Sequence, residues 1–192
     1  MPVHLVTFPL VIPREAEHIS FHDGFGDARH ELGHSAIDIG APAGTSIVSA
    51  TNGMVIHQWV TQRDRRVMSG CGWSDRGGNV VVVIDPQGYA HYYAHMGTSP
   101  LVAPGSCIVA GTRLGFVSNT GSAASGGSNH LHYQVWPIGQ NRDEEWATGI
   151  FTRPFGRAVN AFSELRRLAE PLGARVGERS VIWGGSRRGS RH

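Results

Sequence analysis

Glycine and proline interrupt this chain so often that few stretches could form a long helix. The 26 glycines and 10 prolines separate short apolar runs along all 192 residues, which is typical of many short strands joined by turns. A hydrophobic content of 40% and a charged content of 17% are those of an ordinary globular protein. We therefore predict a mostly β fold, a compact antiparallel sheet, with one C-terminal helix as the exception.

The nearly continuous valine run at 79–85 predicts a central strand that is buried on both faces. A Pro-Gln-Gly turn leads from it into 89–95, which should be its antiparallel partner. Asn52-Gly53 lies between two apolar runs and predicts a hairpin. Further strands are expected at 3–8, 36–39, 47–50, 54–60, 107–109, 114–118 and 130–136, with a polar, arginine-bearing loop over 61–78.

The C-terminal part has a different periodicity. Ala158, Phe162, Leu165 and Ala169 recur at helical spacing until Pro171, which predicts one amphipathic helix packed on the sheet. The basic, glycine-rich stretch at 175–192 is expected to be a disordered tail.

Several classes of protein are disfavoured by composition. A net charge of +2 gives too weak a field to indicate nucleic-acid binding, and no stretch approaches the ~20 apolar residues of a membrane span. The first residues lack the basic start and the cleavage pattern of a secretory signal peptide. Cys71 and Cys107 could form a disulfide or remain free thiols, and their spacing is not that of metal ligands.

Histidines and one aspartate form two short motifs nearly a hundred residues apart. His34 and Asp38 are four positions apart, and His130 and His132 are two apart, so on strands each pair would point to one face. Two imidazoles and one carboxylate, with a position left open for water, are typical of a catalytic zinc site rather than a structural one. The motifs therefore predict metal-assisted hydrolysis.

The segments "GHSAIDIGAPAGTSI", "YYAHM" and "HLHYQV" resemble the lysostaphin-type, LytM-like zinc endopeptidases of family M23. The resemblance covers about residues 24–137. It implies that His34, Asp38 and His132 bind one zinc ion and that His95 and His130 are catalytic. One catalytic histidine would be the general base, and the other would hold the oxyanion or the leaving amine; the resemblance does not say which.

The family cuts peptide bonds of bacterial peptidoglycan, in cross-bridges or stem peptides. The resemblance therefore implies peptidoglycan peptides as the substrate and action at the cell wall, periplasmic or extracellular. Its expected fold is a compact antiparallel β structure with a groove, walled by loops, over the zinc. We expect a lead-in at 1–23, the peptidase domain at 24–137, an extension with the helix at 138–174, and the tail. The bond that is cut and the oligomeric state are left open.

Three positions depart from the family pattern. Ala36 stands where the family commonly has glycine, and Met96 and Tyr133 are size-compatible replacements that should leave the chemistry untouched. His91 has the same strand parity as His95, so it could line the groove or be an exposed strand residue. The loop at 120–129 is expected to contact the substrate backbone.

Two other functions are compatible with these motifs. One is a non-catalytic LytM-like module that binds or activates another wall enzyme, although such modules typically lack zinc ligands that this chain retains. The other is a phage-borne or secretion-delivered lytic protein with the same chemistry.

Overall fold

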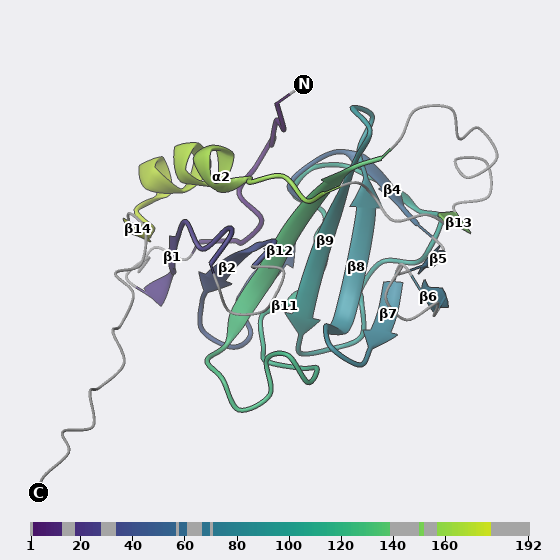
Figure 1. The fold of residues 1–192 in the computed structure, drawn as a ribbon, viewed down its shortest axis with the longest axis horizontal. Helices are drawn as coiled ribbons and strands as arrows, with labels where there is room; N and C mark the ends of the chain where they lie inside the picture. Colours follow the sequence, from purple (N-terminus) through teal and green to yellow (C-terminus); the bar gives the residue numbers. More distant parts are fainter. Residues whose placement is uncertain are drawn as a thin grey trace, which may run out of the picture.

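The computed structural model describes residues 2–12, 18–27, 34–56, 58–60, 67–69, 71–138, 150–151 and 157–177. Its strands form a nine-stranded sheet in the order β10-β4-β8-β9-β12-β2-β1-β14, with β7 also paired to β8, and two smaller sheets, β11-β3 and β13-β5-β6 (Figure 1). The strands of the large sheet are β1 Ser20–His22, β2 Ile37–Gly40, β4 Gly53–Val55, β7 Cys71–Ser74, β8 Gly78–Ile84, β9 Tyr89–Met96, β10 Cys107–Ile108, β12 His130–Pro137 and β14 Arg175–Gly177. The smaller sheets contain β3 Ser46–Val48, β5 Gln58–Val60, β6 Val67–Ser69, β11 Arg113–Phe116 and β13 Ile150–Phe151.

The centre of the sheet is built from β8, β9 and β12, which pair antiparallel. Every residue of β9 is buried, and six of the seven in β8 are buried. β-Branched and aromatic side chains suit such a doubly covered pleated surface. The predicted mostly β fold and the pairing of the valine strand with the next strand are confirmed.

Alternation along these strands sends side chains into two separate apolar clusters. The larger cluster includes Tyr93, Leu131 and Tyr133, and it also takes Leu5 and Phe8 from the lead-in. The smaller cluster lies on the opposite face and includes Val82, Tyr92 and Ala94. The candidate site lies on the face of this smaller cluster, because Tyr92 packs edge-on against His132 at 6.1 Å between ring centroids.

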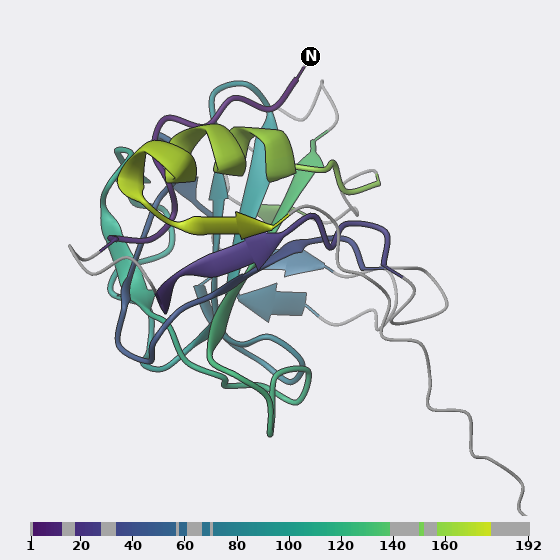
Figure 2. The ribbon, with the colours of Figure 1, turned by 90° about the vertical axis from the view of Figure 1, so that its left-hand side faces the viewer.

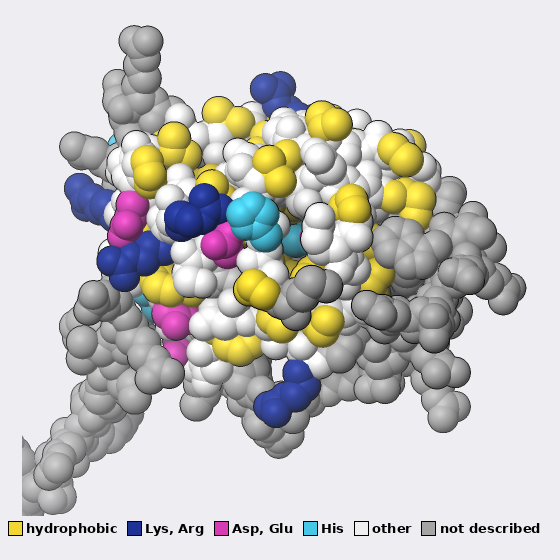
Figure 3. Space-filling view, turned by 90° about the horizontal axis from the view of Figure 1, so that it is seen from above, with side chains coloured by type: hydrophobic (Ala, Val, Ile, Leu, Met, Phe, Trp, Pro, Cys, Tyr) yellow, Lys and Arg dark blue, Asp and Glu magenta, His cyan; other side chains and the backbone are white. Residues whose placement is uncertain are grey.

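The predicted C-terminal helix is present as α2, Phe162–Ala169, followed by a 3-10 turn at Glu170–Leu172. It buries Leu165 and Ala169 and lies over β14 and β1 (Figure 2), where Phe162 packs edge-on against Phe21 at 5.9 Å. Its outer face carries the ion pairs Arg167–Glu164 and Arg166–Glu170. Seen from above, basic and acidic side chains lie next to one another on the left of the molecule (Figure 3).

The predicted Asn52-Gly53 hairpin is wrong. β3 pairs with β11, whereas β4 pairs with β8 and β10, so the two runs that flank Asn52-Gly53 belong to different sheets. Gly53 does not have the positive φ of a type I′ turn. A Cβ at Gly53 would lie 2.2 Å from the Ile84 carbonyl oxygen, so glycine is needed here for close approach to β8.

Three other boundaries also differ from expectation. Residues 3–8 form no strand, because the Val6 and Thr7 amides both donate to the Ala50 carbonyl, which a regular ladder does not allow. The expected 61–78 loop contains β6 and β7, although its residues 61–66 and 70 lie outside the described part. The expected disordered tail is wrong for its first three residues, which form β14 in parallel with β1. Residues 178–192 lie outside the described part.

Cys71 and Cys107 do not form a disulfide, and the Cys71 thiol donates to the Val102 carbonyl at 3.0 Å. No helix in the described ranges is long and apolar enough to cross a membrane.

Candidate functional site

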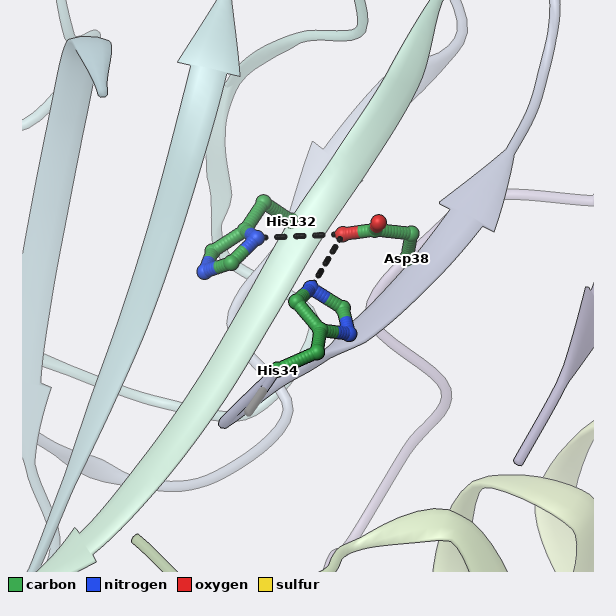
Figure 4. A group of neighbouring side chains, drawn as sticks. All are labelled: His34, Asp38 and His132. Atoms are coloured by element: carbon green, nitrogen blue, oxygen red, sulfur yellow. Dashed lines mark hydrogen bonds and ion pairs between the residues drawn. The ribbon is translucent and has the colours of Figure 1, made fainter. Parts of the chain in front are cut away.

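Asp38 on β2 and His132 on β12 lie directly opposite each other in the antiparallel ladder. Side chains at such cross-strand positions start about 5 Å apart and meet on one face. His132 Nδ1 lies 3.0 Å from Asp38 Oδ1 (Figure 4). The register of two strands that are far apart in sequence therefore forms the first half of the site.

His34 completes this group from the loop before β2, not from a strand as its parity with Asp38 had suggested. Its Nε2 lies 3.3 Å from the same Asp38 oxygen. Its Nδ1–H donates to the Gly24 carbonyl at 3.1 Å, and the ring is buried. Because a carbonyl can only accept, this bond leaves a lone pair on Nε2, directed at the site.

His132 is oriented through the opposite nitrogen. Gln134, two residues further on the same face, donates its amide to Ser35 Oγ at 2.7 Å and turns its Oε1 to within 3.5 Å of His132 Nε2. This arrangement favours the proton on Nε2 and a lone pair on Nδ1. Gln134 was not identified as a site residue from the sequence. Its spacing of two and four residues from His132 and His130 on one strand would have placed it on the same face.

The ligand atoms of His34, Asp38 and His132 lie within 4.8 Å of one another. Two imidazole lone pairs and a carboxylate oxygen are all acceptors, and such a group is held together best by a cation. The donor set fits a zinc ion with an open position.

His130 lies beside this group on β12. Its Nε2 is 3.9 Å from Asp38 Oδ1, and its Nδ1–H donates to the Ser128 carbonyl at 2.8 Å. The carbonyl fixes the tautomer, so the Nε2 lone pair faces the site.

His95 reaches the same site because β9 is bulged. Asn79 pairs with Met96 and Val81 with Tyr93, so Ala94 and His95 together oppose Val80. His95 has φ +64°, the only positive value for a non-glycine residue in the described ranges. The bulge turns the ring to the face of His130 and His132, at centroid distances of 4.8 and 5.6 Å, where simple alternation would have sent it into the larger core.

A loop carbonyl orients His95 in turn. Its Nδ1–H donates to Thr120 at 2.8 Å, and its backbone amide donates to Gly77 at 2.7 Å. Thr120 can approach because Gly78 has no side chain: a Cβ there would lie 2.1 Å from Thr120 Oγ1. Burial lowers the pKa of His95 to about 4, so the ring is neutral with a lone pair on Nε2.

His91 neither lines the groove nor is exposed, so both readings of it are wrong. Because of the bulge, His91 and His95 face opposite sides of the sheet. His91 has no exposed surface, and it lies 2.7 Å from Tyr133 Oη through Nδ1 and 3.1 Å from Asp85 Oδ2 through Nε2. The buried Tyr133 hydroxyl therefore forms a hydrogen bond with His91, which a phenylalanine at position 133 could not form.

The polar, arginine-bearing loop expected at 61–78 is only partly described. Arg63, Arg65 and Arg66 lie outside the described residues, whereas Trp73 is exposed on β7. Tyr92 and Tyr93 on β9 are both buried.

The family model described as Peptidase family M23 matches residues 32–144, more than half of the chain. This range contains all five residues of the candidate site.

Solved structures of this kind share the fold. A candidate glycyl-glycine endopeptidase lytM from Ruminococcus gnavus is 23% identical with a TM-score of 0.64, and the match covers 92% of this chain and 64% of that one. The catalytic domain of the antimicrobial peptidase lysostaphin from Staphylococcus simulans is 20% identical with a TM-score of 0.54, covering 74% and 89%. A longer lysostaphin chain is 21% identical with a TM-score of 0.54, covering 80% of this chain and 51% of that one, so the chain spans about half its length.

The similarity first seen in three short motifs therefore covers residues 32–144 in sequence and is also present in the fold. The chain belongs to peptidase family M23.

Proposed function

We propose that this protein is a zinc-dependent endopeptidase that cleaves peptide bonds of bacterial peptidoglycan at the cell wall. The observation that carries the proposal is the convergence of His34, Asp38 and His132, whose ligand atoms lie within 4.8 Å of one another. Two further histidines with oriented rings lie beside them. The peptidoglycan substrate is proposed from family membership.

His34, Asp38 and His132 would hold the metal. When bound there, zinc supplies a Lewis acid that polarises a carbonyl and lowers the pKa of water towards ~7. The carbonyl of Gly24 and the amide of Gln134 would keep the two imidazole ligands in the correct tautomers, which preserves affinity.

His130 and His95 would handle the protons of hydrolysis. Each donates Nδ1–H to a backbone carbonyl, so each can accept a proton at Nε2 and later return it from the same atom. One ring would take the proton of the attacking water. The other would hold the tetrahedral oxyanion or protonate the leaving amine.

The test is digestion of purified sacculi by the purified protein, with mass spectrometry of the released peptides. A parallel sample receives a chelator, and a third receives chelator followed by excess zinc. New peptide termini that vanish with chelator and return with zinc are the expected result, and their masses identify the bond.

Intact sacculi from several wall types, in spite of about one bound zinc per chain, would contradict the proposal. That outcome would favour the non-catalytic binding or activating module.

A further inference from the structure

Residues 24–27 hold His34 through three hydrogen bonds. The backbone amide of His34 donates to the Asp27 carbonyl at 2.8 Å, and the Gly26 amide donates to the His34 carbonyl at 2.6 Å. The third bond runs from His34 Nδ1–H to the Gly24 carbonyl at 3.1 Å and sets the tautomer. The place and the orientation of this imidazole therefore depend on a segment that precedes the range matched by the family model.

The carboxylate of Asp23 closes the turn that presents Gly24. Its Oδ1 accepts the Phe25 amide at 3.3 Å, a side-chain to backbone bond of the Asx-turn type. Gly24 is buried, and its own amide donates to the His22 carbonyl at 2.8 Å. The direction of the Gly24 carbonyl, and with it the bond to His34, therefore depends on Asp23.

Asn160 in the C-terminal extension binds the same carboxylate. Its Nδ2 donates to both oxygens of Asp23, at 3.0 and 3.2 Å. A hydrogen bond to an ionised carboxylate is about twice as strong as one between neutral groups. At the other end of the side chain, Oδ1 accepts the amide of Phe162, the first residue of α2, at 2.9 Å. The amide side chain of Asn160 is thus held between the helix and Asp23.

The place of Asn160 is fixed in turn by β12. The amide of the preceding residue, Val159, donates to the Val135 carbonyl at 2.9 Å in an isolated antiparallel bridge. Val135 lies three residues after His132 on the same strand. A continuous set of contacts therefore joins the strand that carries one proposed zinc ligand to the turn that orients the other, His34.

We infer that Asp23 and Asn160 are positioning residues for the zinc ligand His34. This inference rests on the proposed function, since it takes His34 as a zinc ligand. Both residues lie outside 32–144, so this chain supplies the support from segments that flank the matched part. An imidazole that is already held in its binding orientation loses less freedom when it binds a metal, and partners behind ligating histidines raise metal affinity roughly 10- to 100-fold.

The test measures the zinc affinity of the purified protein by competition with a chromophoric chelator. Asn160→Asp sets two carboxylates against each other in place of the hydrogen bonds, while the new side chain can still accept the Phe162 amide. Zinc should bind about fivefold more weakly, a smaller loss than for a direct partner of a ligand, because the contact is exposed. An added negative charge by itself favours a cation, so this weakening is opposite in sign to the direct electrostatic effect.

A double variant, Asp23→Asn with Asn160→Asp, re-forms the pair with donor and acceptor exchanged and should recover the zinc affinity of the wild type. The matched control is Asn52→Asp, in the turn before β4, which pairs on the other side of the sheet from β1. Asn52 is exposed and its Oδ1 also accepts a backbone amide, that of Ala110, so this variant should bind zinc as the wild type does. Urea unfolding of the zinc-free proteins should give similar midpoints for all of them.

Unchanged zinc affinity in Asn160→Asp, with or without a lower urea midpoint, would overturn this inference and leave the peptidase proposal intact. Failure of the double variant to recover affinity would do the same. A wild-type protein that binds no zinc would overturn both.

Discussion

The two faces of the central sheet each carry a histidine–aspartate pair, with different surroundings. On one face His132 Nδ1 lies 3.0 Å from Asp38, and on the other His91 Nε2 lies 3.1 Å from Asp85. Asp38 is partly exposed and is approached by His34 and His130 as well. Asp85 is 1% exposed and receives the Tyr89 amide at 2.7 Å.

The difference lies in which way the lone pairs point. Around Asp85 each acceptor has a donor: His91 donates from Nε2, and the Tyr133 hydroxyl donates to its Nδ1. Around Asp38 the lone pairs of His34 and His132 converge on the carboxylate, as they would around the proposed zinc ion. A close histidine–aspartate distance therefore does not distinguish a metal site from a structural network, whereas the fixed tautomers do.

The largest expected effect comes from removing the Asp38 carboxylate. Asp38→Ala should reduce bound zinc from about one per chain to below about a tenth, because two imidazoles alone hold zinc weakly. Sacculus digestion should fall to the level of the chelated wild type. Metal analysis and the digestion assay check this, and normal zinc content in the variant would show that the ligand set is wrong.

His130→Ala should separate chemistry from metal binding. The zinc content should stay at about one per chain, while turnover falls roughly 10²- to 10³-fold, as for loss of a general acid or base. His4→Ala, at an exposed histidine that pairs with Glu164 on α2, is the matched control and should keep full turnover. Full activity of His130→Ala would remove His130 from the mechanism.

Much of the fold was predictable because it depends on local patterns. The valine run of β8 and the apolar spacing of α2 each indicated an element that the structure contains. The hairpin at Asn52-Gly53 was not predictable in the same way, because that glycine serves contact with Ile84 on another strand. Turn signals report local geometry, whereas this contact depends on the assembled sheet.

The candidate site was predictable in its residues but not in its orientation. Alternation placed His130 and His132 correctly, and it failed for His95 because a bulge and a positive φ reverse its face. The assumption of regular alternation also placed His91 on the face of His95, whereas the bulge puts the two histidines on opposite faces. The carbonyls of Gly24, Thr120 and Ser128 that set the tautomers leave no sequence signal, because any residue supplies a backbone carbonyl.

Removing the Asp85 carboxylate should lower the free energy of unfolding and leave the zinc content unchanged. Asp85→Ala should lower the free energy of unfolding by about 3 kcal/mol, because the buried His91 N–H and the Tyr89 amide lose their acceptor. Urea unfolding of the zinc-free proteins measures this, and Asp85→Asn, which retains one acceptor oxygen, should recover part of the loss. The folded variant should still bind about one zinc; loss of zinc at constant stability would contradict the contrast between the two pairs.

Tyr133→Phe gives the smallest and most specific effect. Phenylalanine fills nearly the same volume, but it leaves His91 Nδ1 without its 2.7 Å donor. We expect a loss of about 1 kcal/mol in the free energy of unfolding, with zinc content and digestion unchanged. A double-mutant cycle with His91→Leu isolates the contact, since the paired change removes both polar partners and should cost less than the sum of the single changes. Additive costs would mean that the hydroxyl and the imidazole do not stabilise each other. Reduced digestion in Tyr133→Phe would instead mean that the network of Asp85, His91 and Tyr133 also positions the neighbouring His132. The two faces of the sheet would then be energetically coupled.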